Sequence, residues 1–139
     1  MDDIEAIKQL KARYCRTLDT KDWAGFRRVF TDDVTIDTTD SGGPVINGAD
    51  RHIAFLTGTL GDRRTVHHAH LPEIELTSAT TATAIWAMQD LVDLPDGGEL
   101  RGYGHYHETY EKTGDGWHIA TLRLTRLRMD LFPAAAGAS

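Results

Sequence analysis

The second half of this chain contains four consecutive runs that are rich in strand-forming residues and separated by short turns. Val, Ile, Thr, Tyr, Phe and Trp favour strands because their side chains fit a pleated, half-buried surface. The breaks between the runs contain the Ser, Asp, Gly and Pro residues that favour tight turns. Tight connections join antiparallel neighbours, so the sequence predicts one long antiparallel meander. We expect its strands at about residues 64–76, 79–93, 99–112 and 116–131.

The first half of the chain has helical periodicity instead. Between residues 2 and 19, apolar side chains recur at steps of three and four, which is typical of an amphipathic helix. Similar helical patterns predict a short helix at about residues 20–31 and a third helix at 47–60. We expect a short strand between them, at residues 34–37. Three helices followed by a meander predict an α+β domain, in which the helices cover one face of a strongly curved sheet and enclose a cone-shaped cavity.

The length of 139 residues fits one domain that buries enough surface to fold without a disulfide or a metal. The sequence contains no internal repeat. We expect a single domain over residues 1–132. A flexible tail is expected at residues 133–139, where Pro, Ala, Gly and Ser offer little surface for packing.

The charge distribution argues against nucleic acid as a partner. The chain has 15 Lys+Arg and 21 Asp+Glu, and its basic residues form no continuous stripe. Its single cysteine, Cys15, excludes an intrachain disulfide, and the N-terminal residues lack the pattern of a signal peptide. No uncharged apolar stretch approaches the roughly 18 residues that span a bilayer. We therefore expect a cytoplasmic protein without a membrane partner.

Five polar or ionisable side chains lie in segments that otherwise have the composition of a core. Such groups are costly to bury without partners, so their placement indicates a reactive pocket. They are Tyr14, Asp19, His67, Asp90 and Arg126. Tyr14 lies on the apolar stripe of the first helix, where a phenol either bonds to backbone or donates to a substrate oxygen. Asp19 lies one turn further on, and its alternative role is to cap the turn that follows.

Three histidines, His67, His68 and His70, occur within four residues of the first long strand. In a regular strand His67 faces one side of the sheet, and the other two histidines face the opposite side. Ile74, an apolar residue that we expect to point inward, has the parity of His68. An inward His67 therefore requires a bulge in the strand near Pro72.

The last two candidates lie on later strands. Asp90 follows a mostly apolar run, and it is either a solvated residue at a strand end or a carboxylate that orients His67 and raises its basicity. Arg126 lies between Leu124 and Leu127. Its side chain either extends along the surface to water or turns inward, where it would stabilise a developing enolate or bind a carboxylate.

A metal site is the alternative interpretation of the histidine cluster. His68-Ala69-His70 followed by Glu75 fits the first half of a cupin-type His-x-His-x4-Glu ligand pattern on a β scaffold. The second half of that pattern is missing, because no histidine follows Pro95-Asp96-Gly97 at the required spacing. Cupins also do not begin with a long helical segment. We therefore expect no metal at these histidines.

Nearly the whole chain, from residue 4 to 131, resembles the SnoaL-like branch of the nuclear transport factor 2-like superfamily. The resemblance is closest to the bile-acid 7α-dehydratases and more distant to scytalone dehydratase. The segments that carry it are residues 3–11, 14–19, 67–74, 80–83, 110–112 and 116–117, together with Trp86. The family pattern has a Tyr-x4-Asp in the first helix, a His five residues before Pro-Glu-Ile, an Asp on the next strand and an Arg nine residues after the last Trp. The matching positions here are Tyr14, Asp19, His67, Asp90 and Arg126.

This resemblance implies an acid/base mechanism without metal or organic cofactor. By analogy, His67 is poised by Asp90 and abstracts a proton from a carbon next to, or conjugated with, a carbonyl group. Tyr14 hydrogen-bonds the substrate oxygen and helps to polarise it or to protonate the leaving hydroxyl. Arg126 would stabilise negative charge, and Asp19 would orient Tyr14 or the substrate.

The resemblance also implies a substrate class and a quaternary structure. We expect a dehydratase that eliminates water from a hydrophobic hydroxylated keto substrate of steroid, polyketide or aromatic type, with His68, Trp86 and Tyr106 contacting it. A homodimer or homotrimer is expected by the same analogy. The alternatives are a ketosteroid-isomerase-like isomerase and a non-catalytic small-molecule-binding module. One fold hosts all three, so the fold does not choose among them.

Overall fold

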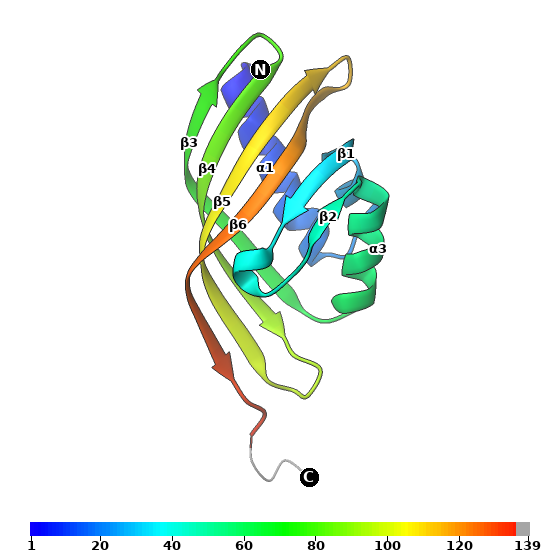
Figure 1. Ribbon diagram of the computed structural model, residues 1–139, viewed down its shortest axis with the longest axis vertical. Helices are drawn as coiled ribbons and strands as arrows, with labels where there is room; N and C mark the ends of the chain where they lie inside the picture. The colour runs from blue at the N-terminus through cyan, green and yellow to red at the C-terminus, as the bar shows by residue number, and fades with distance from the viewer. Residues whose placement is uncertain (136–139) are drawn as a thin grey trace.

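The computed structural model describes residues 1–135 of the protein and contains three α-helices, a 3-10 helix and six strands in that range. This composition confirms the predicted α+β class (Figure 1). The elements in chain order are α1 (Asp3–Asp19), α2 (Trp23–Arg27), β1 (Phe30–Asp37), the 3-10 helix η1 (Thr39–Ser41), β2 (Val45–Asn47), α3 (Ala49–Thr59), β3 (Thr65–Leu76), β4 (Thr81–Asp93), β5 (Glu99–Thr113) and β6 (Gly116–Phe132).

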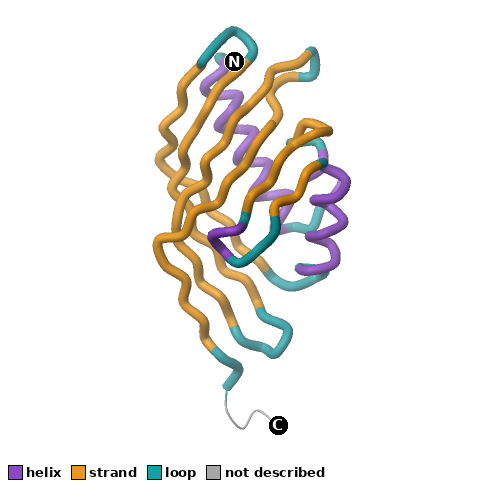
Figure 2. Tube along the Cα trace, in the orientation of Figure 1, coloured by secondary structure: helices purple, strands orange, loops and turns teal. Residues whose placement is uncertain are grey.

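The six strands form one sheet in the order β2-β1-β6-β5-β4-β3. Strands β3 to β6 are the predicted antiparallel meander, whereas β1 pairs with β6 in parallel. The sheet curves strongly along its length, with α1 behind the meander and α3 beside β1 and β2 (Figures 1 and 2). The expected mainly antiparallel, curved sheet with three helices is therefore confirmed. The predicted second helix was too long, since α2 ends at Arg27 and β1 already begins at Phe30.

Alternate residues of the meander face the helices and form the core. On β4 the buried positions are the even-numbered ones, and their partners on β5 are also buried. This alternation follows from the two-residue repeat of a strand. The buried side chains of α1 pack against this inner face, so a group on α1 and a group on β4 can meet although they are far apart in sequence. The core side chains of α1 are Ile7, Leu10, Tyr14 and Leu18.

Strand β3 contains the bulge that an inward His67 requires. His70 pairs with Ala87 and Glu73 pairs with Ile85, so β3 carries one more residue than β4 between these pairs. Leu71, within this irregularity, has a φ of 45°. The extra residue brings His67 and Ile74 to the same inner face in spite of their opposite parity.

No helix in residues 1–135 has both the length and the apolar character that crossing a membrane needs. The tail that we expected at residues 133–139 lies partly outside the described residues. Residues 133–135 form neither helix nor strand.

Candidate active site

The carboxylate of Asp19, the last residue of α1, contacts His67 on β3 twice. Its Oδ1 lies 2.7 Å from Nδ1 of His67, and its Oδ2 accepts the backbone N–H of His67 at 2.7 Å. The hydroxyl of Thr65 also donates to Oδ1, at 2.9 Å. A carboxylate beside Nδ1 favours the imidazole tautomer with its proton on that atom, which leaves Nε2 as the proton acceptor.

Asp90 and Arg126 form a buried bidentate ion pair. Nη1 of Arg126 donates to Oδ1 of Asp90 at 2.8 Å, and Nη2 donates to Oδ2 at 3.0 Å. The side chain of Arg126 is 8% exposed and that of Asp90 is 6% exposed. Asp90 is the partner of His67 across the β3–β4 register, and Nε2 of His67 lies 3.9 Å from Oδ2 of Asp90. The free imidazole nitrogen therefore faces a carboxylate that the guanidinium already neutralises.

Gly102 on β5 has no side chain, and this provides the space for the Asp90–Arg126 ion pair. It pairs with Asp90 in the sheet register, and a Cβ at this position would overlap Nη1 of Arg126 and Oδ1 of Asp90. Arg126 is held from a second side, because its Nε donates to Oγ of Ser41 at 2.8 Å and its backbone N–H donates to Asp40 at 2.6 Å. The guanidinium is thus held by β4 through Asp90 and by η1 through Ser41, and Asp40 of η1 holds the backbone of Arg126.

Tyr14 of α1 is buried among aromatic rings on the inner face. Its ring lies 5.2 Å from Phe26, 6.0 Å from Phe30 and 5.7 Å from Tyr106, measured between centroids. Burial raises the pKa of Tyr14 well above its usual value, and the charge of Glu108 acts in the same direction, whereas a hydrogen bond from Tyr106 opposes them. The phenol therefore keeps its proton and is available as a hydrogen-bond donor.

A fully buried ion pair lies against the rings of Tyr14 and Tyr106. Nζ of Lys11 is 2.6 Å from Oε2 of Glu108, and it lies 3.5 Å and 3.6 Å from the centroids of the two rings. Burial lowers the pKa of Lys11, and the charge of Glu108 opposes this effect. Sequence reasoning missed this pair. The only features of the sequence that point to the pair are that Lys11 follows Leu10 on α1 and that Glu108 has the same strand parity as the inward-facing Tyr106.

Trp86, which we expected to contact the substrate, is linked by hydrogen bonds to the Lys11–Glu108 pair. The indole N–H of Trp86 donates to the hydroxyl of Tyr110 at 2.9 Å, and that hydroxyl donates to Oε1 of Glu108 at 2.6 Å. Both Glu108 oxygens are therefore bonded. Tyr106 lies on the inner face beside Tyr14, as its parity predicts.

The structure corrects two expected roles. Asp19 rather than Asp90 contacts Nδ1 of His67, because both oxygens of Asp90 are engaged by Arg126. The hydrogen bonds of the Asp19 carboxylate go to Thr65 and His67 rather than to Tyr14, and the alternative role, orientation of the substrate, stays a prediction. Sequence spacing places both carboxylates near the imidazole, but only the three-dimensional arrangement shows which one the guanidinium occupies.

His68 lies on the other side of β3 from His67. It is exposed, its ring centroid is 5.8 Å from that of His70, and its Nδ1 is 3.5 Å from the amide nitrogen of Gln89. His68 therefore lies outside the contacts that join His67 to Asp19 and Asp90, although it lines a groove that His67 and Trp86 also line. Within residues 1–135, no three His, Cys, Asp or Glu side chains are arranged to hold a metal ion.

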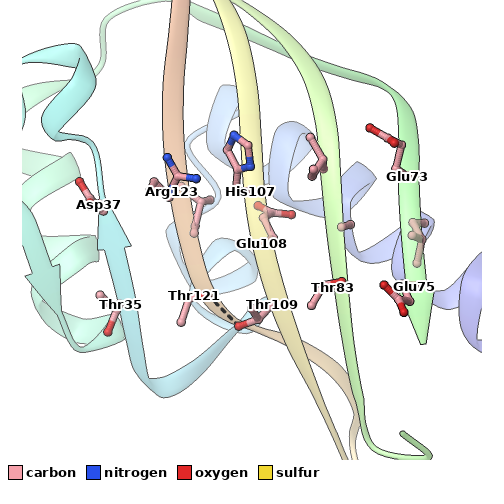
Figure 3. Close-up of a pocket in the computed structure, with 14 residues that line it drawn as sticks. Thr35, Asp37, Glu73, Glu75, Thr83, His107, Glu108, Thr109, Thr121 and Arg123 are labelled. Carbon is pink, nitrogen blue, oxygen red and sulfur yellow. Dashed lines mark hydrogen bonds between the residues drawn. The ribbon is translucent and has the colours of Figure 1, made fainter. Parts of the chain in front are cut away.

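A groove of about 380 Å³ lies between α1 and β3, and His67 is among its lining residues. A larger trough of about 720 Å³ lies on the outer face of the sheet (Figure 3), where Arg123 projects from β6, His107 from β5 and Glu73 from β3. Thr109 is hydrogen-bonded there to Thr121 at 2.7 Å. None of the five predicted catalytic residues lines this trough.

Comparison with known proteins supports the fold and identifies the family. A curated relative from Gibberella zeae named "Probable cyclase FGR4" is 29% identical over 133 residues, which cover 87% of this chain and 89% of that protein. The crystal structure of Kfla4162 from Kribbella flavida matches with a TM-score of 0.84 and 26% identity, over 92% of this chain and 93% of that one. Hexachlorocyclohexane dehydrochlorinase LinA-type3 from Novosphingobium barchaimii matches in fold, with a TM-score of 0.81 and 17% identity over 96% of this chain and 90% of that one. The sequence pattern of the SnoaL-like domain matches residues 1–123. The chain therefore belongs to the SnoaL-like domain family of the nuclear transport factor 2-like superfamily.

Proposed function

We propose that this protein is a cofactor-independent acid/base enzyme, and specifically a dehydratase that eliminates water from a hydrophobic hydroxylated keto substrate of steroid, polyketide or aromatic type. The observation that carries the proposal is the contact of 2.7 Å between Asp19 and Nδ1 of His67. The imidazole is only 10% exposed, and the Asp90–Arg126 pair lies beside it. Membership of the SnoaL-like family supports a small-molecule-converting enzyme.

His67 is the base in the proposed reaction. Its Nε2 accepts a proton from the carbon next to the substrate carbonyl, and the imidazolium that forms is stabilised by Asp19 at Nδ1. The electron pair of the broken C–H bond moves onto the carbonyl oxygen as an enolate, and it returns to form the new C=C bond as the C–O bond to the hydroxyl breaks. The hydroxyl takes the proton from the imidazolium and leaves as water. The products are an enone and water, and His67 returns to its neutral form.

Tyr14 and Arg126 stabilise the negative charge that develops on the carbonyl oxygen. The raised pKa of Tyr14 favours hydrogen-bond donation over transfer of its proton. Of the five N–H groups of the Arg126 guanidinium, three bond to Asp90 and Ser41 and a fourth, on Nη1, donates to Sδ of Met88 at 3.7 Å, so one on Nη2 remains for a substrate oxygen. Preorganised donors of this kind act strongly in a buried site, because water does not compete for them.

The test is turnover of a panel of β-hydroxy ketones with steroid, bicyclic and aromatic bodies, followed by the absorbance of the enone product. His67→Ala should reduce the rate by about 10²-fold or more, with a nearly unchanged melting temperature. His105→Ala, at a histidine of β5 that lines neither the groove nor the trough, is the control and should retain the rate. Unchanged turnover in His67→Ala, or a large loss of stability in that variant, would refute the proposal.

The same proteins separate the two alternatives. An isomerase would convert β,γ-unsaturated ketones into conjugated ones without releasing water, and this conversion would also depend on His67. A binding module would retain the ligand in a calorimetric titration and turn over neither panel. Each outcome assigns a different function to the same residues.

A further inference from the structure

The groove between α1 and β3 reaches His67 from the side of the sheet edge. Its volume of about 380 Å³ is within the range of small-molecule sites, which hold about 300–1,000 Å³. Helix α1 contributes Lys8 and Ala12 to its walls, β3 contributes His67, and β4 contributes Trp86. The groove therefore borders both the proposed base and the exposed side chain of Lys8.

The charge of the groove is opposite to that of the protein as a whole. The chain has a net charge of −6, yet the lining consists of two lysines, three histidines, two alanines, a cysteine and a tryptophan, without any acidic residue. The charge of Lys11 is balanced in the interior by Glu108 at 2.6 Å. Lys8 takes part in none of the ion pairs within residues 1–135, so the groove presents an unpaired cation.

Apart from the two lysines and the three histidines, the lining is apolar or uncharged. Ala12, Ala69 and Trp86 offer hydrocarbon and aromatic surface. Burial raises the pKa of the Cys15 thiol to about 11, so this side chain is also uncharged at neutral pH. An apolar wall with a cation at one part of it is complementary to an amphiphilic anion.

We propose that this groove binds a carboxylate-bearing apolar molecule, with its carboxylate at Lys8 and its apolar body against Ala12, Cys15 and Trp86. The inference deepens the proposed function and rests on it in one respect, because the end of the molecule that reaches His67 is then the reacting end. The substrate class becomes a hydroxylated keto acid. An uncharged steroid or polyketide ketone would lack the contact with Lys8.

The probes are naphthalene-2-carboxylate and its uncharged counterpart naphthalene-2-carboxamide, titrated separately into the protein and followed by amide NMR shifts. The carboxylate should shift residues of α1 and β3 that line the groove. It should bind at least about 10-fold more tightly than the amide, a difference of about 1.4 kcal/mol. Equal affinities, or shifts confined to the outer trough, would overturn the proposal.

Three variants make the test specific. Lys8→Gln should abolish the preference for the carboxylate, whereas Arg16→Gln, an exposed residue of the same helix outside the groove, should leave it unchanged. Ala12→Phe should fill the groove and weaken both probes. If Arg16→Gln has the same effect as Lys8→Gln, the preference reflects the general charge of α1 and the proposal is wrong. Because Lys8 and Arg16 are both exposed, neither change depends on repacking of the core.

Failure of this inference is distinguishable from failure of the proposed function. The NMR titration needs no turnover and is repeated in His67→Ala, which should bind the carboxylate while losing the reaction. If the carboxylate binds selectively but no ketone is turned over, the proposal for the groove stands and the proposed dehydratase activity is refuted. If uncharged hydroxy ketones are turned over but the carboxylate does not bind selectively, the proposal for the groove is refuted and the proposed dehydratase activity stands.

Discussion

Asp19 and His67, 48 residues apart in the chain, are joined by two contacts of 2.7 Å, one to the backbone N–H and one to Nδ1. The first contact fixes where the end of α1 sits on β3, and the second fixes the direction of the imidazole ring. A change in the packing of α1 on the sheet would therefore also change the position of the proposed base.

Replacement of Asp19 by Asn tests this coupling. The amide keeps the shape of the carboxylate but loses its charge, so it no longer stabilises the imidazolium or selects the tautomer with its proton on Nδ1. We expect kcat/KM to fall by about 10²–10⁴-fold, measured with the ketone panel. Asp33→Asn, an exposed residue outside the site, should show wild-type kinetics. Wild-type activity in Asp19→Asn would mean that the carboxylate only joins α1 to β3.

Gly102→Ala should disrupt the Asp90–Arg126 pair, because the added Cβ occupies the space of Nη1 and Oδ1. Overpacking of this kind costs about 1–3 kcal/mol of unfolding free energy, and turnover should fall as well. Urea unfolding and the ketone assay measure the two effects. Gly114→Ala is the control, since no atom lies within 4 Å of the corresponding Cβ. Equal stability of the two variants would contradict the tight approach seen at Gly102.

The buried pair of Lys11 and Glu108 should behave differently when one partner or both are removed. Lys11→Met leaves a carboxylate in the core without its counter-charge, which typically costs about 3–5 kcal/mol. Lys11→Met combined with Glu108→Gln removes both charges and should recover much of this loss. Chemical unfolding of the wild type and the two variants measures the difference. If the double variant is as unstable as the single one, the loss arises from packing against Tyr14 and Tyr106 rather than from charge.

His52 on α3 should make the protein less stable in mild acid. Burial lowers the pKa of His52 to about 4 from an ordinary value of 6.5, and its Nδ1 has no hydrogen-bond partner in the described part of the chain. Between these two pH values the unfolded state binds the proton and the folded state does not. The contribution of His52 to the free energy of unfolding is therefore complete above about pH 6.5. It is lost as the pH falls toward 4, and the loss amounts to about 3 kcal/mol.

The check is urea unfolding of the wild type and of His52→Leu at a series of pH values from 4 to 8. Many carboxylates also titrate in this range, and the difference between the two proteins isolates the contribution of His52. The wild type should lose stability relative to the variant as the pH falls. A difference that is constant with pH would show that His52 is already charged in the folded protein, or exposed to water.

The homodimer or homotrimer that the family resemblance implies stays a prediction. The trough on the outer face of the sheet is the broad surface on which self-association would be tested, and Arg123 projects into it (Figure 3). Sedimentation velocity at several concentrations should show a species larger than 15.4 kDa. A strict monomer would contradict the expectation.

Most of the fold could be predicted from local patterns. The four meander strands were predicted within two residues of their observed bounds, because alternation and turn residues are local signals. Strand β2 was not predicted. It has only three residues, from Val45 to Asn47, and it depends on pairing with β1 rather than on its own composition.

The candidate site was predictable as a set of residues but not as a set of contacts. Family resemblance selected Asp19, Asp90 and His67, and the structure brings all three together. The carboxylate that orients the imidazole is the one that Arg126 does not bind. The choice therefore depends on contacts between residues that are far apart in the sequence. The partnership of Lys11 and Glu108, 97 residues apart, has the same origin.

The bulge between His70 and Glu73 makes the site depend on chain length as well as on side-chain chemistry. A deletion of Leu71 would leave every proposed reacting group in the sequence. With the surplus residue gone, however, either the imidazole or the side chain of Ile74 would have to change faces. In a strand of this kind, an insertion or deletion of one residue is enough to separate an intact set of catalytic groups.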